Sequence, residues 1–257
     1  MEADFWIFML VGFAAQIVDG ALGMAYGVVS TTALLSMGVS PAAASASVHA
    51  AKVFTGAASA ASHVAHKNID WKLLVLLSIG GVIGGVAGTY LITSVDGKLI
   101  RPWVIAWLFL MGLVILYRAW RNARPRVLPV HGPAPLGLIG GFFDAIGGGG
   151  WGPIVTSTLL SSGADVRKAI GTTNTAELFV AVAVSASFIA ALVSGHWQNT
   201  EMADHLWPVL GLIVGGVIAA PVAGWVTKVM PLKVLTWMVG FLVTGLAVWQ
   251  ALQLILK

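Results

Sequence analysis

The chain contains the same glycine-rich break twice, and this internal repeat constrains the fold more than any other feature. The first copy is Asp19–Gly27 (DGALGMAYG) and the second is Asp144–Gly152 (DAIGGGGWG). A constant offset of 125 residues relates them, and the match continues without a gap to Phe54 and Phe179, with 11 of 36 positions identical. A repeat of this length predicts two half-molecules built on one plan.

The composition places both halves in a membrane. The 257 residues are 58% hydrophobic and only 9% charged, with a mean hydropathy of +0.91. A soluble domain carries about 25% charged residues, so we expect an all-α polytopic membrane protein. The chain has no cysteine, which excludes disulfides, thiolate metal sites and cysteine nucleophiles. We expect no cofactor and no metal site.

Each half is predicted to contain one pair of short helices. The segments that flank the breaks, Phe5–Val18 with Val28–Met37 and Leu136–Ala145 with Ile154–Leu160, are shorter than the roughly 20 residues of a membrane span. Six longer apolar segments follow them: Pro41–Ala65, Leu73–Thr93, Pro102–Ala119, Val166–Val193, Leu206–Val226 and Leu232–Leu256. The predicted division is a first half-repeat at 1–119, a basic connector at 120–134 and a second half-repeat at 135–257.

Two topologies compete, and the basic residues distinguish them. If each broken pair crosses the membrane, the halves are parallel and 13 Lys and Arg residues divide seven to six between the two faces. If each pair enters and returns as a re-entrant hairpin, the halves are inverted and the division is ten to three. The ten are Lys67, Lys72, Arg118, Arg121, Arg124, Arg126, Arg167, Lys168, Lys228 and Lys233, and the three are Lys98, Arg101 and Lys257. Only the second division obeys the positive-inside rule, so we predict inverted repeats with a cytoplasmic connector.

The remaining basic residue, Lys52, lies inside the first long helix, with His49 three positions before it on the same face. The offset pairs Lys52 with Glu177 and His49 with Asn174, and Asp19 with Asp144. Ionisable groups inside a bilayer are costly, so they pair with one another or face water.

These features predict an anion site at mid-membrane. The second helix of each short pair begins just after its glycines, so its free N–H groups and positive dipole end point toward the membrane centre. Glycines allow an anion to approach such a backbone closely, and several inverted-repeat transporters hold substrate between broken helices. Lys52 and His49 would add positive charge, and Asp19, Asp144 and Glu177 are candidates for coupling or gating.

Simpler interpretations stay open for each residue. Lys52 either contacts substrate or forms a buried pair with Glu177. His49 is either a core histidine or a ligand or proton carrier. Asp19 and Asp144 either cap helices through backbone N–H groups or carry protons.

The two repeated stretches resemble the sulfite exporter TauE/SafE family of membrane transporters. The resemblance is carried by VDGALGMAYGVVSTTALLSMGVSPAAASASVHAAKVFTG and FDAIGGGGWGPIVTSTLLSSGADVRKAIGTTNTAELF, and by later glycine pairs at Gly80-Gly81 and Gly215-Gly216. It implies transport of small sulfur-containing anions, such as sulfite or organosulfonates, across the bacterial inner membrane. Carried over by position, it implies a substrate site at Gly23, Gly27, Gly148, Gly149, Gly150, Gly152, Thr172 and Asn174.

The leading hypothesis is therefore a secondary transporter, with a small oxyanion and the lipid bilayer as partners and no nucleic acid. An anion channel, or a transporter of another small carboxylate or sulfonate, is the alternative, and a homo-oligomer stays open. An enzyme is disfavoured because neither H-E-x-x-H nor G-x-S-x-G occurs.

Overall fold

The computed structural model describes residues 2–120, 132–162, 164–197, 206–229 and 232–256, and all regular structure in that part of the chain is helical. The sequence prediction of an all-helical protein is confirmed. The elements are α1 (Glu2–Leu22), α2 (Tyr26–Ser36), α3 (Pro41–Ala65), α4 (Trp71–Ser94), α5 (Gly97–Trp120), α6 (Pro133–Gly147), the π-helical turn η1 (Gly152–Thr156), α7 (Ser157–Ser161), α8 (Val166–Val193), α9 (Leu206–Val229) and α10 (Leu232–Ile255).

Four helices among the described residues are long and apolar enough to cross a membrane. They cover Trp71–Ser94, Gly97–Trp120, Arg167–Val193 and Thr236–Ile255. At 1.5 Å per residue, a helix of 24 residues measures about 36 Å, which exceeds the roughly 30 Å hydrocarbon core. Their exposed faces carry large apolar side chains, as lipid-facing surfaces do. The protein is therefore a multi-pass integral membrane protein.

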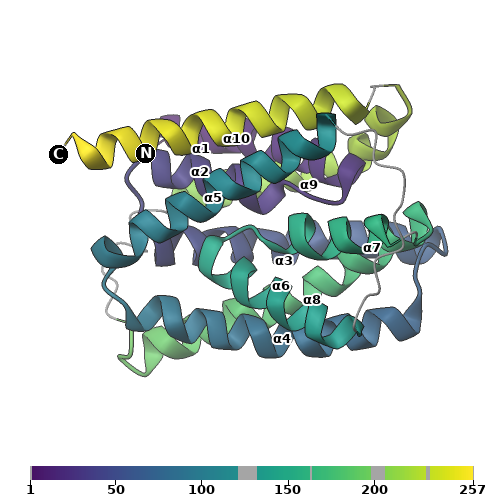
Figure 1. Ribbon diagram of the computed structural model, residues 1–257, viewed down its shortest axis with the longest axis horizontal. Helices are drawn as coiled ribbons and strands as arrows, with labels where there is room; N and C mark the ends of the chain where they lie inside the picture. The colour runs from purple at the N-terminus through teal and green to yellow at the C-terminus, as the bar shows by residue number, and fades with distance from the viewer. Residues whose placement is uncertain (1, 121–131, 163, 198–205, 230–231, 257) are drawn as a thin grey trace.

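The helices of the two halves interleave. Helix α1 packs along α9, α4 packs along α6, and α5 packs along α10, so each main pairing joins one half to the other. Helices α3 and α8 contact each other in the middle of the bundle, and Figure 1 shows α3 lying between the layer that contains α10 and the layer that contains α4. The core at the centre of the molecule is thus formed by both halves together.

Glycines allow the closest of these pairings. A Cβ placed on Gly84 of α4 would overlap the backbone carbonyl of Leu138 in α6, and one on Gly215 of α9 would overlap the carbonyl of Met9 in α1. Without a side chain at these positions the helix backbones touch, which is the usual way that membrane helices maximise their packing contacts. Gly215 belongs to the pair Gly215-Gly216 noted in the sequence, and Gly84 follows the pair Gly80-Gly81 by about one helical turn.

Several helices are longer than the sequence predicted, α1 and α5 most of all. Helix α1 has 21 residues, against the 14-residue segment Phe5–Val18, because it continues through Asp19 and ends only where Gly23 adopts a left-handed backbone (φ +65°). Helix α5 begins at Gly97 and carries Pro102 inside it, so the proline does not begin the helix as predicted. Several residues of the topology prediction lie outside the described part, namely Arg121, Arg124, Arg126 and Lys257, together with most of the connector.

Candidate functional site

Asp144 lies at the end of α6 and is fully buried. The chain turns back after it through Gly148, whose backbone is left-handed (φ +64°), a conformation that glycine adopts without steric cost. The turn brings the N–H groups of Gly150 and Trp151 to Asp144 Oδ1, at 2.7 and 3.1 Å. The carboxylate therefore caps the first N–H groups of the following helix.

Asp19 makes the equivalent contact in the first copy. The Tyr26 N–H donates to Asp19 Oδ1 at 3.1 Å, just as the Trp151 N–H donates to Asp144. The chain turns at Gly23, and the residue before α2, Ala25, has the unfavourable φ of +121°. The capping role that the sequence left open for both aspartates is therefore present in the structure.

The two breaks lie directly against each other. A Cβ on Gly27 would lie 2.7 Å from the Cα of Gly149 and 2.8 Å from Lys52 Nζ. A Cβ on Gly152 would lie 2.6 Å from the Cα of Met24. The glycines thus permit a backbone-to-backbone crossing of the two halves, with the Lys52 ammonium beside it.

A buried ionic cluster adjoins this crossing. Lys52 Nζ lies 2.7 Å from Glu177 Oε1 and 3.2 Å from Asp144 Oδ1, and His49 Nε2 lies 3.1 Å from Asp144 Oδ2. Lys52 therefore pairs with Glu177, and it also pairs with Asp144, a contact that the sequence repeat does not indicate. Charges this deeply buried require such partners, because each unpaired ion would carry a large desolvation cost.

Hydrogen bonding places a proton between His49 and Asp144. His49 Nδ1 lies 2.8 Å from the carbonyl oxygen of Ser45, which only accepts, so Nδ1 carries hydrogen. The contact of Nε2 with Asp144 Oδ2 needs a second proton, held by one atom or the other. The net charge of the His49–Asp144 pair is then zero, and so is that of the Lys52–Glu177 pair. Asp19 is left as the carboxylate of this cluster that has no cation of its own.

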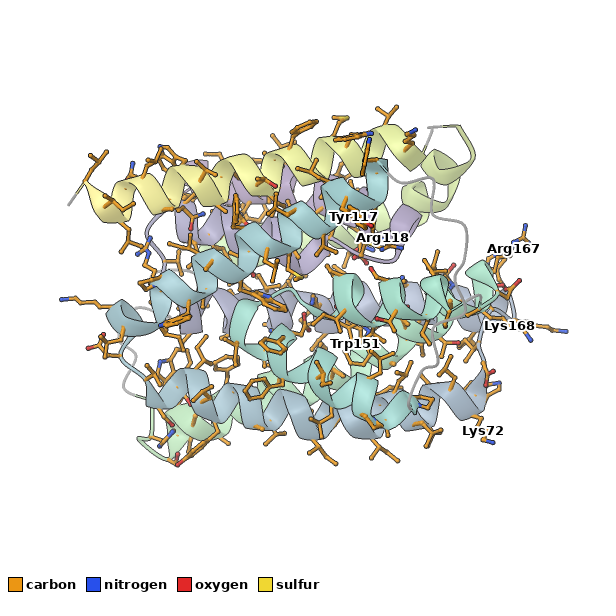
Figure 2. The ribbon with its side chains drawn as sticks, viewed as in Figure 1. Lys72, Tyr117, Arg118, Trp151, Arg167 and Lys168 are labelled. Carbon is orange, nitrogen blue, oxygen red and sulfur yellow. The ribbon has the colours of Figure 1, made fainter. Side chains whose placement is uncertain are left out.

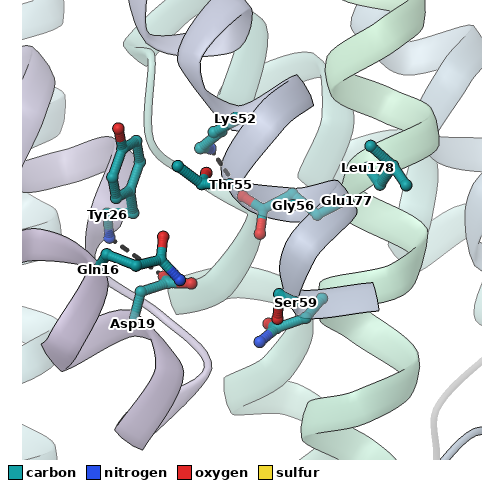
Figure 3. A pocket seen from close by; sticks show the side chains of 10 residues that line it. Gln16, Asp19, Tyr26, Lys52, Thr55, Gly56, Ser59, Glu177 and Leu178 are labelled. Carbon is teal, nitrogen blue, oxygen red and sulfur yellow. Dashed lines mark hydrogen bonds and ion pairs between the residues drawn. The ribbon is translucent and has the colours of Figure 1, made fainter. Parts of the chain in front are cut away.

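Two small polar cavities flank Lys52. One measures about 20 Å³ and is lined by Gln16, Asp19, Tyr26, Lys52, Thr55, Gly56, Ser59, Asn174, Glu177 and Leu178. Figure 3 shows the labelled members of this set around Lys52, which points toward Glu177. The other, about 10 Å³, lies at the crossing of the breaks and shares Asp19, Lys52 and Glu177 with the first. A single water needs about 10–15 Å³, so each cavity has room for at most a water or two.

The structure separates the two polar residues predicted on α8. Asn174 lines the larger cavity and is 4% exposed, and neither its amide nitrogen nor its amide oxygen has a hydrogen-bond partner among the described residues. Thr172 Oγ1 instead accepts from the N–H of Asp70, at 2.9 Å, and is not among the residues that line the two cavities.

Sequence reasoning missed several residues of the site. Thr55 and Ser59 follow Lys52 at three and seven positions, so the helical period alone could have found them. Arg118, interpreted from sequence as a topology signal, donates from Nη1 to Ser157 Oγ and to Met24 Sδ. No signal in the sequence linked Arg118 to the breaks, because these contacts join residues far apart in the chain.

A larger hollow of about 530 Å³ lies at the beginning of α3. Its lining includes Ser40 and Pro41 at that end of α3, Asp96 between α4 and α5, Lys98 at the start of α5, and Trp197. No group of three His, Asp or Glu side chains in the described residues is arranged to hold a metal ion.

Comparison with known proteins agrees with the membrane fold. The family described as "Sulfite exporter TauE/SafE" matches residues 8–252. A curated relative from Bacillus subtilis (strain 168), named "Probable membrane transporter protein YtnM", is 42% identical over 229 residues, which cover 86% of this chain and 74% of the relative. No solved structure matches the chain. The match over nearly the whole length, including both breaks and the Lys52 cluster, shows that this chain belongs to the sulfite exporter TauE/SafE family of membrane transporters.

Proposed function

We propose that the protein exports a small sulfur-containing oxyanion, such as sulfite or an organosulfonate, across the bacterial inner membrane by alternating access. The observation that carries the proposal is the crossing of the two glycine breaks beside Lys52. The N–H groups of Gly27 and Val28 lie in the first turn of α2, where a helix offers them no internal acceptor, and both residues line the small cavity with Lys52. Bare N–H groups next to an ammonium form an environment suited to an anion.

Alternating access is proposed because the site has too little free volume for the anion. A sulfur oxyanion has at least four heavy atoms, and the cavities beside Lys52 hold about one or two waters. The anion therefore needs the breaks and the neighbouring helices to separate before it enters. Movement of one half against the other would open the site to one side of the membrane and then to the other.

Inverted repeats with re-entrant hairpins are proposed as the framework for this movement. Lys72, Arg167 and Lys168 lie at one end of the molecule (Figure 2), which agrees with the inverted arrangement, since parallel halves would separate Lys72 from the other two. Contacts between equivalent positions support it further. Gly23 approaches Thr156 while its counterpart Gly148 approaches Thr31, the counterpart of Thr156. Such reciprocal contacts are expected at a twofold axis.

The cluster suggests how transport is driven. An inside-negative potential already favours anion export by about 2.3 kcal/mol per charge per 100 mV. Asp19, Asp144 and Glu177 would hold the site closed through their contacts with Lys52 and with helix ends. Protonation of one of them would lower the negative charge that an entering anion meets, and would couple its movement to a proton.

The first test is thermal stabilisation of the purified protein by sulfite, sulfate, thiosulfate, sulfoacetate, taurine and acetate. A ligand at one hundred times its dissociation constant stabilises the folded state by about 2.7 kcal/mol. We expect one sulfur anion to raise the melting temperature, and Lys52→Ala to abolish the shift. If no anion stabilises the wild-type protein and none is transported by vesicles, the proposal is wrong. Transport without saturation or counterflow would instead identify an anion channel.

A further inference from the structure

A polar face runs the whole length of α3. At 100° per residue, seven polar side chains fall within an arc of about 120° on this helix: Ser45, His49, Lys52, Thr55, Ser59, His63 and His66, which we call the α3 polar face. The remainder of α3 consists of Ala, Val, Gly, Phe and Pro apart from Ser47 and Ser62. A helix buried in a membrane protein has little reason to carry one continuous polar face unless that face pairs with polar groups or meets water.

The α3 polar face connects the two spaces that lie on either side of the ionic cluster. Ser40 and Pro41, about one helical turn before its first residue Ser45, lie in the wall of the 530 Å³ hollow. Ser45 follows and donates to the carbonyl oxygen of Ala145 at the break. Beyond His49 and Lys52, Thr55 and Ser59 line the 20 Å³ cavity.

The far end of the face leads to the basic end of the molecule. His63 is half-buried and His66 is exposed, where α3 ends. Next to this end, Asp70 at the start of α4 is joined to Thr172 of α8, and Lys72, Arg167 and Lys168 lie at the same end in Figure 2. A series of cations and histidines at this end would attract small anions from the adjacent solution.

Asn174 gives a second and independent indication of a ligand. Its amide is almost fully buried, lines the same cavity as Ser59, and has no hydrogen-bond partner for its nitrogen or its oxygen among the described residues. Buried amides are nearly always hydrogen-bonded. An oxyanion that entered the cavity would accept from the amide N–H₂ group and from the Ser59 and Thr55 hydroxyls.

We infer that the transported oxyanion moves along the α3 polar face, with the cavity at Ser59 and Asn174 on one side of the barrier and the hollow at Ser40 on the other. The His49–Asp144 and Lys52–Glu177 pairs form the barrier between the two sides. This inference rests on the proposed transport function and adds its route.

The absence of cysteine from the chain makes the route directly testable. The test variant is Ser59→Cys on the α3 polar face. The controls are Ala57→Cys and Ala61→Cys on the exposed opposite face of α3. They lie two residues before and after Ser59, so they bracket its position along the helix. Each variant is reconstituted in vesicles and treated from one side with a membrane-impermeant anionic thiosulfonate. A thiol reacts as its thiolate, which forms in water and not in lipid.

We expect Ser59→Cys to react at least ten-fold faster than either control, and only from the side that carries Lys72 and Arg167. Ser40→Cys, in the wall of the 530 Å³ hollow, should react only from the opposite side. Equal rates for Ser59→Cys and the two controls would overturn the route. If Ser59→Cys does not fold, Thr55→Cys on the same face is tested in its place. We expect the same faster reaction from the same side.

The outcomes separate the route from the function. If an anion stabilises the protein and is transported, but Ser59→Cys and Thr55→Cys stay as unreactive as the controls, the route is wrong and the transport function stands. If the cysteines react as expected but no anion in the panel is bound or moved, the polar face conducts a different solute and the proposed substrate class is wrong.

Discussion

Lys52 and Glu177 occupy the same position in the two copies of the repeat, and their side chains form an ion pair with Nζ 2.7 Å from Oε1. The ion pair joins helices α3 and α8, which pack against each other. Movement of one half against the other would change this contact.

We predict that the two charges depend on each other for stability. Lys52→Met leaves the buried Asp144 and the partly buried Glu177 without their shared ammonium and should destabilise the protein by about 3–5 kcal/mol. The double variant Lys52→Met/Glu177→Met should lose clearly less than the sum of the two single changes, because Glu177 is then no longer left without its cation. Melting of all three variants in detergent measures this coupling, with the exposed Lys98→Ala as control. Strict additivity would contradict the interaction.

Anion affinity should depend on pH through the cluster. The charged groups that face Glu177 are Lys52, Asp144 and Asp19, so protonation of a carboxylate at lower pH leaves less negative charge to repel an anion. Binding should therefore strengthen as pH falls and weaken as pH rises.

Glu177→Gln should remove most of this dependence, because the amide keeps the shape without the charge. We expect roughly ten-fold tighter anion binding at high pH, equivalent to about 1.4 kcal/mol. Calorimetric titration across pH measures both effects, and Asp165→Asn, at the exposed start of α8, serves as control. An unchanged pH profile in Glu177→Gln would assign the coupling to another group.

The crossing of the breaks should tolerate no side chain. Gly27→Ala places a methyl group against the carbonyl of Gly148 and 2.8 Å from Lys52 Nζ, so we expect transport to be lost and the melting temperature to fall. Gly245→Ala is the matched control, since a Cβ there meets no atom within 4 Å. It should be neutral or slightly stabilising, because alanine favours the helix. Normal transport by Gly27→Ala would show that the two breaks separate more easily than their contact suggests.

Ala25→Gly should stabilise the protein. Ala25 has φ +121°, a strained conformation for a residue with a Cβ that costs about 1–3 kcal/mol. Glycine relieves this strain, but it also raises the conformational entropy of the unfolded chain. We therefore expect a net stabilisation of the folded state by about 1 kcal/mol. Ala33→Gly, inside α2, should destabilise by a similar amount. A lower melting temperature for Ala25→Gly would show that the methyl group has packing contacts that outweigh the strain.

Arg118 should contribute to anion affinity. It is partly buried, and its described bonds go to a hydroxyl and a thioether next to the breaks, so the positive charge is available to an anion that separates them. Arg118→Gln should weaken binding roughly ten-fold, or about 1.4 kcal/mol. Arg167→Gln, at the exposed end of α8, is the control and should change affinity little. Equal effects of the two changes would indicate general electrostatic attraction and not a local contact.

The sequence by itself determined the local features. Composition and segment length predict helices in a bilayer, and the repeat identifies the breaks at Gly23 and Gly148, both of which have the left-handed turn. Helical spacing places His49 and Lys52 on one face. Each of these conclusions depends on residues close together in the chain, or on a comparison of two similar stretches.

Only the tertiary structure decided which groups meet. Asp144 binds His49 and Lys52, which precede it by 95 and 92 residues, and Arg118 reaches Ser157 and Met24. These contacts exist because α6 of the second half packs along α4 and beside α3 of the first. Helical periodicity states which face a side chain occupies but not which helix lies opposite that face. The interleaving of the two halves determines which helices face each other. As a result Lys52 pairs with two carboxylates, Glu177 and Asp144, whereas the repeat alone indicates only Glu177.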